Sequence, residues 1–89
     1  MEREVVLILE HSYTENNDKH YKGIHNGQEV KILSRNREDG RKNYLALTIG
    51  LAKALEFNGV NDLNQAMHKY KCRLYGLHKD KMEVTIYLN

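Results

Sequence analysis

The sequence has no proline and no tryptophan, and it contains a single cysteine among its 89 residues. One cysteine excludes an internal disulfide and favours a reducing, cytosolic setting. The longest apolar block spans only residues 5–9, whereas a membrane-spanning helix needs about 18 apolar residues or more. The start MEREVV is acidic, unlike the basic start of a signal peptide. We therefore expect a cytoplasmic protein without a membrane partner.

Recognisable catalytic signatures are also missing. The sequence contains no Gly-x-Ser-x-Gly, Walker, His-Glu-x-x-His or Cys-x-x-Cys motif. Its five histidines are scattered, and on an extended strand His20 and His25 would point to opposite faces, which makes them a poor pair of metal ligands. The sequence therefore predicts a protein that is not an enzyme and that has no cofactor and no metal site.

Charge is distributed unevenly along a chain of otherwise ordinary composition. A hydrophobic content of 40% and a charged content of 29% are typical of globular proteins, and the length suits one small domain over residues 1–89. Residues 1–18 carry a net charge of −4, whereas residues 31–42 carry +3 and residues 69–81 carry +4. The two basic segments are therefore the first candidates for binding an anionic partner.

Strand patterns occupy both ends of the chain. The apolar block over residues 4–11 is typical of a central strand covered on both faces. Two strand-like runs, 19–25 and 28–34, flank Asn26 and Gly27, a pair that strongly predicts a tight hairpin turn. Two further strands are predicted over 71–77 and 82–88, and the last alternates apolar and polar residues, as expected for a strand with one wet face.

Helical spacing dominates the middle of the chain. Residues 41–57 predict a long helix, whose apolar stripe of Tyr44, Leu47, Leu51 and Leu55 is widened by Leu45, Ile49 and Ala52. Gly59 is the expected C-terminal cap. A second helix is predicted after Asn61 or Asp62 and as far as Tyr70. The expected fold is therefore α+β, a mainly antiparallel sheet in the order β-β-β-α-α-β-β with the long helix 41–57 packed on one face.

This order of three strands and a helix, with the segments LILEHSY, RKNYLALTIGLAKAL and VTIY, resembles the ribonuclease H family. The resemblance implies a two-metal nuclease site in which Glu10 takes the first acidic position. Tyr44 stands where that family has a glutamate, and the sequence ends at Asn89 where it has an aspartate. The resemblance therefore implies a degenerate ribonuclease H-like domain, which we keep as a third hypothesis.

The first basic segment leads directly into the long helix. Cations in a first helical turn are unfavourable by roughly 0.3 to 1 kcal/mol each, so Arg41 and Lys42 need a partner. Glu38 and Asp39 could be that partner locally. Alternatively, the free N–H groups of the helix start, together with Arg35, Arg37, Arg41 and Lys42, form an anion site suited to phosphate.

The second basic segment carries Lys71, Arg73 and Tyr75, which alternate onto one face of a strand and could hold phosphates and stack a base. The alternative is that these cations only protect an edge strand from aggregation.

Two main functions remain open. The first is a small non-catalytic protein that binds phosphate-bearing ligands, either nucleic acid or a nucleotide. The second is a protein-protein interaction module, such as a small phage-type inhibitor of a host factor, which the Asn-, Lys- and Tyr-rich composition suggests. A homo-oligomer is compatible with both, because so small a chain has a small core.

Overall fold

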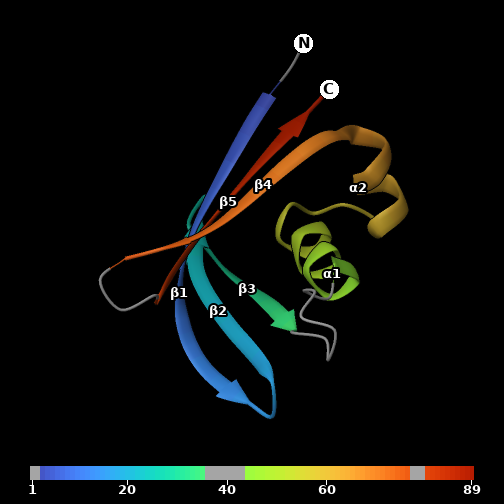
Figure 1. Ribbon diagram of the computed structural model, residues 1–89. Helices are drawn as coiled ribbons and strands as arrows, with labels where there is room; N and C mark the ends of the chain where they lie inside the picture. Colours follow the sequence, from blue (N-terminus) through green and yellow to red (C-terminus); the bar gives the residue numbers. More distant parts are fainter. Residues whose placement is uncertain (1–2, 36–43, 77–79) are drawn as a thin grey trace.

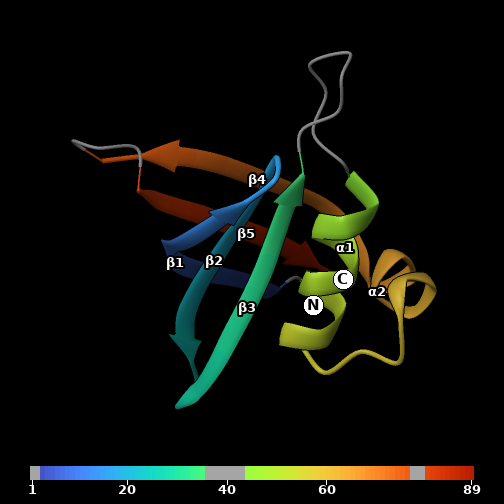
Figure 2. The ribbon, with the colours of Figure 1, turned by 90° about the horizontal axis from the view of Figure 1, so that it is seen from below.

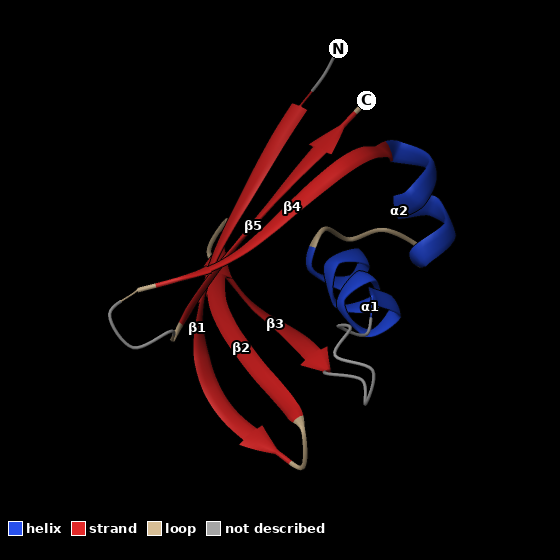
Figure 3. Cartoon of the chain, in the orientation of Figure 1, coloured by secondary structure: helices blue, strands red, loops and turns tan. Residues whose placement is uncertain are grey.

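The computed structural model describes residues 3–35, 44–76 and 80–89, which form a five-stranded sheet and two helices (Figure 1). In chain order the elements are β1 (Arg3–Glu15), β2 (Asp18–His25), β3 (Gln28–Arg35), α1 (Tyr44–Ala54), α2 (Val60–Ala66), β4 (Met67–Tyr75) and β5 (Lys81–Leu88). The strands lie in the order β3-β2-β1-β5-β4, and every neighbouring pair is antiparallel. Both helices lie on the same side of the sheet (Figure 3). The predicted α+β class and the order of elements are confirmed, and both hairpins belong to one sheet.

The hairpin between β2 and β3 turns at the predicted pair. Asn26 and Gly27 both have positive φ, 52° and 78°, as the favoured two-residue turn requires. Asparagine and glycine tolerate this left-handed conformation better than other residues. The local chemistry of these two residues therefore sets the register of the hairpin, from His25 opposite Gln28 to Asp18 opposite Arg35.

Strand β1 is the long central strand that joins the two halves of the sheet. Its first part pairs with β5, from Arg3 opposite Leu88 to Glu10 opposite Lys81, and its second part pairs with β2 from Leu9 onward. Figure 2 shows that β3 runs at a steep angle to β4 and β5. At the junction, a Cβ atom on Gly23 would lie 2.5 Å from the carbonyl oxygen of Ile8. Only glycine allows this close approach of β2 to β1.

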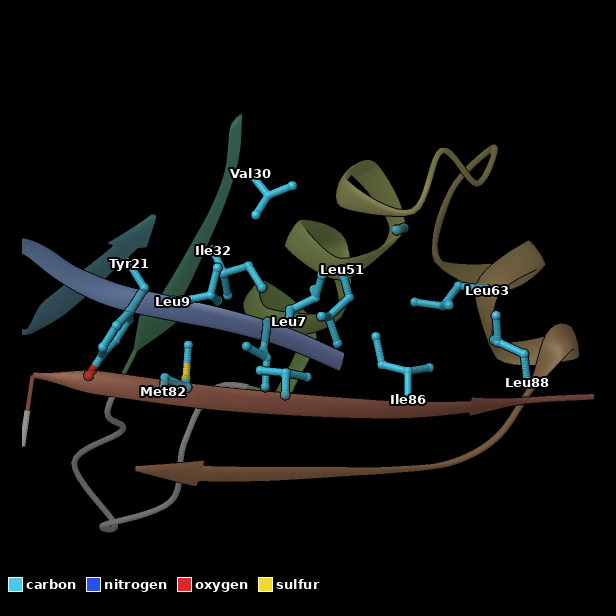
Figure 4. Packing of buried hydrophobic residues seen from close by; sticks show 13 residues of the cluster. Leu7, Leu9, Tyr21, Val30, Ile32, Leu51, Leu63, Met82, Ile86 and Leu88 are labelled. Atoms are coloured by element: carbon cyan, nitrogen blue, oxygen red, sulfur yellow. The ribbon is translucent and has the colours of Figure 1, made fainter. Parts of the chain in front are cut away.

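The core lies between the sheet and the two helices (Figure 4). Every strand from β1 to β3, and β5 as well, contributes alternate apolar residues to it, and the helices add one side each. The buried apolar residues are Leu7, Leu9, Tyr21, Val30, Ile32, Leu47, Leu51, Ala52, Leu63, Met82, Val84, Ile86 and Leu88. Burying a leucine, valine or isoleucine stabilises the fold by roughly 1.5–3 kcal/mol, so this layer holds the helices on one face.

Helix α1 ends three residues earlier than predicted. Residues 41–43 of the expected helix lie outside the described residues, and the helix ends at Ala54 instead of residue 57. The N–H of Phe57 donates a hydrogen bond to the carbonyl of Ala52, and the N–H of Glu56 donates one to the carbonyl of Lys53. This pair of hydrogen bonds defines a Schellman cap. Glu56 takes the left-handed position with φ of 61°. Gly59 is therefore not the C-terminal cap, because a non-glycine residue already ends the helix.

The apolar face of α1 is narrower than predicted. Leu47 and Leu51 are buried, but Leu45 is 59% exposed and Ile49 is 42% exposed, so the widened stripe is wrong at these two positions. The helix lies alongside β3, close enough that a Cβ on Gly50 would be 3.4 Å from the Cα of Ile32. One side of α1 therefore meets β3 and the core, while Leu45 and Ile49 are exposed and do not belong to the buried core.

The boundary between α2 and β4 also differs from the prediction. The helix begins after Gly59, which makes no side-chain cap, and it ends at Ala66. The next residues join β4, where Tyr70 lies opposite Ile86 of β5. Pairing with β5 therefore overrides the helical spacing that predicted a helix as far as Tyr70.

Candidate functional site

The face of the sheet opposite the two helices, here called the open face, is uncovered by the rest of the described chain (Figure 1). On β1 this face carries Val6 and Ile8, which are 41% and 47% exposed. The prediction that the first strand is covered on both faces is therefore wrong. A continuous apolar sequence shows that both faces are apolar, but it does not show that the fold supplies a second layer.

Strand β4 places its polar residues on the open face. Lys69, Lys71 and Arg73 are exposed and Tyr75 is half-buried, whereas Tyr70 and Cys72, between them, pack against the core. Because side chains alternate along a strand, the four residues form one row along the edge of the sheet. The predicted trio of Lys71, Arg73 and Tyr75 is thus brought together on one surface.

The neighbouring strand β5 completes this surface. Tyr87 lies opposite Lys69, Thr85 opposite Lys71, and Glu83 opposite Arg73. We call the set Lys69, Lys71, Arg73, Tyr75 and Tyr87 the β4–β5 platform. Its cations stand beside its aromatic rings: the Lys69 Nζ lies 4.4 Å from the centre of the Tyr87 ring, and the Arg73 guanidinium lies 5.7 Å from that of Tyr75.

These contacts between cations and rings are weak, because a cation over a ring face at an exposed site gains only about 0.5–1 kcal/mol. A ligand can therefore displace them. A planar base could replace the cation on the ring, and the freed ammonium or guanidinium could then bind the phosphate of the same ligand. The platform therefore combines rings on which bases can stack with cationic side chains that can turn toward a phosphate.

Acidic groups do not neutralise the platform. Two carboxylates adjoin it by strand register: Glu83 lies opposite Arg73 and accepts a hydrogen bond of 3.3 Å from the Thr85 hydroxyl, and Glu4 of β1 lies opposite Tyr87. Farther along β5, Lys81 lies 3.8 Å from Glu10 of β1. Three cations of β4 thus lie beside two carboxylates, Glu83 and Glu4, which leaves a small net positive charge that favours anions.

Arg35, the fourth described member of the predicted site, lies elsewhere. It is on β3, at the opposite edge of the sheet from β4. Its guanidinium donates two hydrogen bonds, of 2.8 and 2.9 Å, to the carboxylate of Asp18. These bonds hold the pKa of Asp18 below its usual value and raise the pKa of Arg35. The structure therefore does not group Arg35 with Lys71 and Arg73, and it shows Arg35 already engaged by a carboxylate.

The remaining predicted residues, Arg37, Arg41 and Lys42, lie outside the described residues, so the anion site at the start of the long helix stays a prediction. On the β4–β5 platform, the structure adds Lys69 and Tyr87, which were not among the predicted site residues. Lys69 continues the alternation of Lys71 and Arg73, a signal that the sequence contains. The position of Tyr87 beside Lys69 depends on strand register, which the sequence did not reveal.

Residues 3–35, 44–76 and 80–89 show neither a metal site nor a membrane-spanning helix. In these ranges no group of three or more His, Cys, Asp or Glu side chains is arranged to hold a metal ion. The same ranges contain no helix of the length and apolar character needed to cross a membrane. No protein-family model matches the chain, and no curated protein or solved structure matches it either.

Proposed function

We propose that the protein is a non-catalytic binder of single-stranded nucleic acid and that the β4–β5 platform is its binding surface. The observation that carries this proposal is the arrangement of three exposed cations beside two tyrosine rings on the open face. Proteins that bind single strands combine a positive surface for the backbone with aromatic rings for the bases. A duplex hides the faces of its bases, so the rings favour a single strand.

The dimensions of the platform favour a polymer over a mononucleotide. Lys69 and Arg73 are separated by four residues of strand, or about 13 Å at the usual rise per residue. Tyr87, which lies opposite Lys69, is therefore about 20 Å from Tyr75 along the strand direction. One nucleotide cannot reach both rings, whereas an extended strand running along β4 could place a base on each.

The proposal can be tested by fluorescence anisotropy with labelled oligothymidine and oligouridine of about ten nucleotides, a length within the usual range for such sites. The variant Lys69→Gln/Lys71→Gln/Arg73→Gln keeps most of each side-chain stem and removes three charges. It should weaken binding and lower the slope of log affinity against log salt by about 2, because each phosphate contact contributes about 0.7 for single strands.

The rings are tested separately. Tyr87→Leu should weaken binding by roughly 1–3 kcal/mol, the usual contribution of one stacked base, whereas Tyr87→Phe keeps the ring and should bind nearly as the wild type does. Lys19→Gln is the matched charge control: Lys19 is exposed on β2, and by alternation it lies on the same face as buried Tyr21, away from the platform. If the salt slope falls as much in the Lys19 variant as in the Lys69/Lys71/Arg73 variant, the proposal is contradicted. If a mononucleotide competes with the oligonucleotide, the ligand is a small nucleotide instead.

Exposed aliphatic residues on the open face support protein binding as the second candidate. Ile24 is 77% exposed, and Val6 and Ile8 are also exposed. A protein partner that covers this apolar surface would lose less affinity with salt than a nucleic acid would. Absence of oligonucleotide binding at low salt would favour this second function. In that case Ile8→Ser should weaken binding of the protein partner, whereas Lys71→Gln should have little effect on it.

A further inference from the structure

One row of side chains crosses the open face from edge to edge. The register of the strands places Tyr75 opposite Lys81, Lys81 opposite Glu10, Glu10 opposite Lys22, and Lys22 opposite Lys31. Each of these residues therefore points to the open face. With strands about 4.8 Å apart, the row spans about 19 Å. It begins at the β4–β5 platform and ends on β3.

The far end of the row contains an unfavourable pair. Lys22 and Lys31 lie directly opposite one another on neighbouring strands, and like charges in this position destabilise a sheet. Lys31 has a partial compensation, because its Nζ lies 3.4 Å from the carboxylate of Glu29. Lys22 makes no ion pair with any other described residue. A bound anion between the two ammonium groups would relieve the repulsion.

The surface beside this pair is hollow and carries a second aromatic group. A depression of about 250 Å³ is lined by the lysine pair and its neighbours on β1, β2 and β3. Two of these neighbours, Tyr13 and His20, are stacked with their ring centres 4.1 Å apart and their planes within 7°. Tyr13 is about half exposed. Cations and exposed rings therefore meet again here, as they do on the β4–β5 platform.

We infer that a bound single strand does not stay on β4 but crosses the sheet along this row, and that its far end occupies a second contact site made by Lys22, Lys31, Tyr13 and His20. Phosphate oxygens would lie between the two lysines, and a base would stack on the exposed side of Tyr13. Lys81, already near Glu10, would contribute charge midway. This inference rests on the proposed function, because it extends the same ligand beyond the platform.

The test compares oligothymidines of about four and about ten nucleotides, which span the range of small single-strand sites. The variant Lys22→Gln/Lys31→Gln should weaken binding of the longer oligomer about tenfold and lower its salt slope by about 1.4, for two phosphate contacts. It should leave the shorter oligomer within about twofold of the wild type, because the platform alone holds it. Lys71→Gln/Arg73→Gln should weaken both lengths.

Lys19→Gln is the matched control, because it removes one lysine from the same strand on the other face. Equal binding of the longer oligomer by the wild type and the Lys22/Lys31 variant would overturn the second contact site and leave the proposed function intact. An equal loss for both lengths would also overturn it, since the lysines would then act only through the general charge of the protein. Failure of the wild type to bind either length would overturn the proposed function itself.

Discussion

The two edges of the sheet are protected in different ways. At one edge, helix α1 lies alongside β3, with Gly50 allowing close contact to Ile32. The charged residues of β3 are matched locally, as in the pair of Arg35 with Asp18. At the other edge, α2 leads directly into β4, whose three exposed cations face one carboxylate on β5. An edge beside a helix can carry mixed charge, whereas an exposed edge needs charge of one sign to discourage pairing with other chains.

This comparison gives the cations of β4 two roles that are not exclusive. By general edge-strand behaviour they would discourage edge-to-edge association, and under the proposed function they would also bind a polyanion. The two roles separate by experiment, because association depends on the edge of β4 itself, whereas ligand binding also depends on the tyrosine rings.

The largest effect is expected at the point that joins the two halves of the sheet. Gly23→Ala should reduce the free energy of unfolding by about 3 kcal/mol, because its Cβ would clash with the Ile8 backbone, which cannot move as a side chain can. Chemical unfolding in urea measures the change. Gly50→Ala is the control: its Cβ would make ordinary contact with Ile32, and alanine gains up to about 1 kcal/mol in a helix. A Gly23 variant as stable as the wild type would show that β1 and β2 can separate without loss.

The next prediction tests the two edges directly. Lys71→Val/Arg73→Val should cause concentration-dependent association, because it replaces two of the three cations of the exposed edge with β-branched apolar residues. The matched change on the other edge, Glu29→Val/Lys31→Val, should leave the mass at the wild-type value, because α1 lies beside that strand. Light scattering after size-exclusion chromatography gives both masses. Equal association of the two variants would remove the difference between the edges.

A smaller effect is expected where α1 ends beside the core. Glu56 occupies the left-handed position of the Schellman cap, where a residue with a Cβ loses roughly 1–2 kcal/mol relative to glycine. Glu56→Gly should therefore stabilise the protein by about 1 kcal/mol, visible as a higher Tm. Glu15→Gly, within β1, should be destabilising. If Glu56→Gly lowers the Tm instead, the left-handed position is not the main constraint on this residue.

The smallest effect concerns the ion pair on β3. Because Arg35 lowers the pKa of Asp18 in the folded protein, the stabilisation from this pair is present above the unfolded pKa and is lost as the pH falls through the folded pKa, below about pH 4. Arg35→Gln should raise the Asp18 pKa toward its ordinary value, as followed by NMR titration of the carboxyl carbon. Lys31→Gln should leave it unchanged. The stability change should be small, because Arg35 is exposed and Asp18 is partly exposed, so that solvent screens the pair.

Local chemistry explains which parts of the fold were predictable. The hairpin at Asn26 and Gly27 depends on the φ preferences of two residues, and the alternation of β5 depends on one strand. The hairpin prediction was correct. The core side of β5 was also correct, but its other side is not a wet face, because Thr85 there is buried between the neighbouring strands β1 and β4. The end of α1 was not predicted, because a glutamate rarely adopts positive φ and Gly59 offered a more ordinary cap. Helix boundaries that depend on such exceptions cannot be read from residue preferences alone.

The site was predictable only in part, for a related reason. Alternation placed Lys71, Arg73 and Tyr75 on one face of a strand, and the structure agrees. Whether this face was buried or open depended on the layers of the fold. The same alternation extends to Lys69, but the position of Tyr87 beside it depended on strand register. Long-range pairing of this kind is determined by the whole chain, so the sequence could suggest half of the platform but not its other half.

The position of β1 has a consequence for how the chain folds. Its first part pairs with β5, so that Arg3 meets Leu88, and closing so long a loop carries a large entropic cost. The β1-β2-β3 meander can form early from nearby residues, while β5 must dock across almost the entire chain, which is expected to make folding slow for so small a protein. The β4–β5 hairpin that carries the platform is also built from nearby residues. What forms late is therefore the junction of the two hairpins through β1 and β5, and with it the row of side chains that crosses the open face.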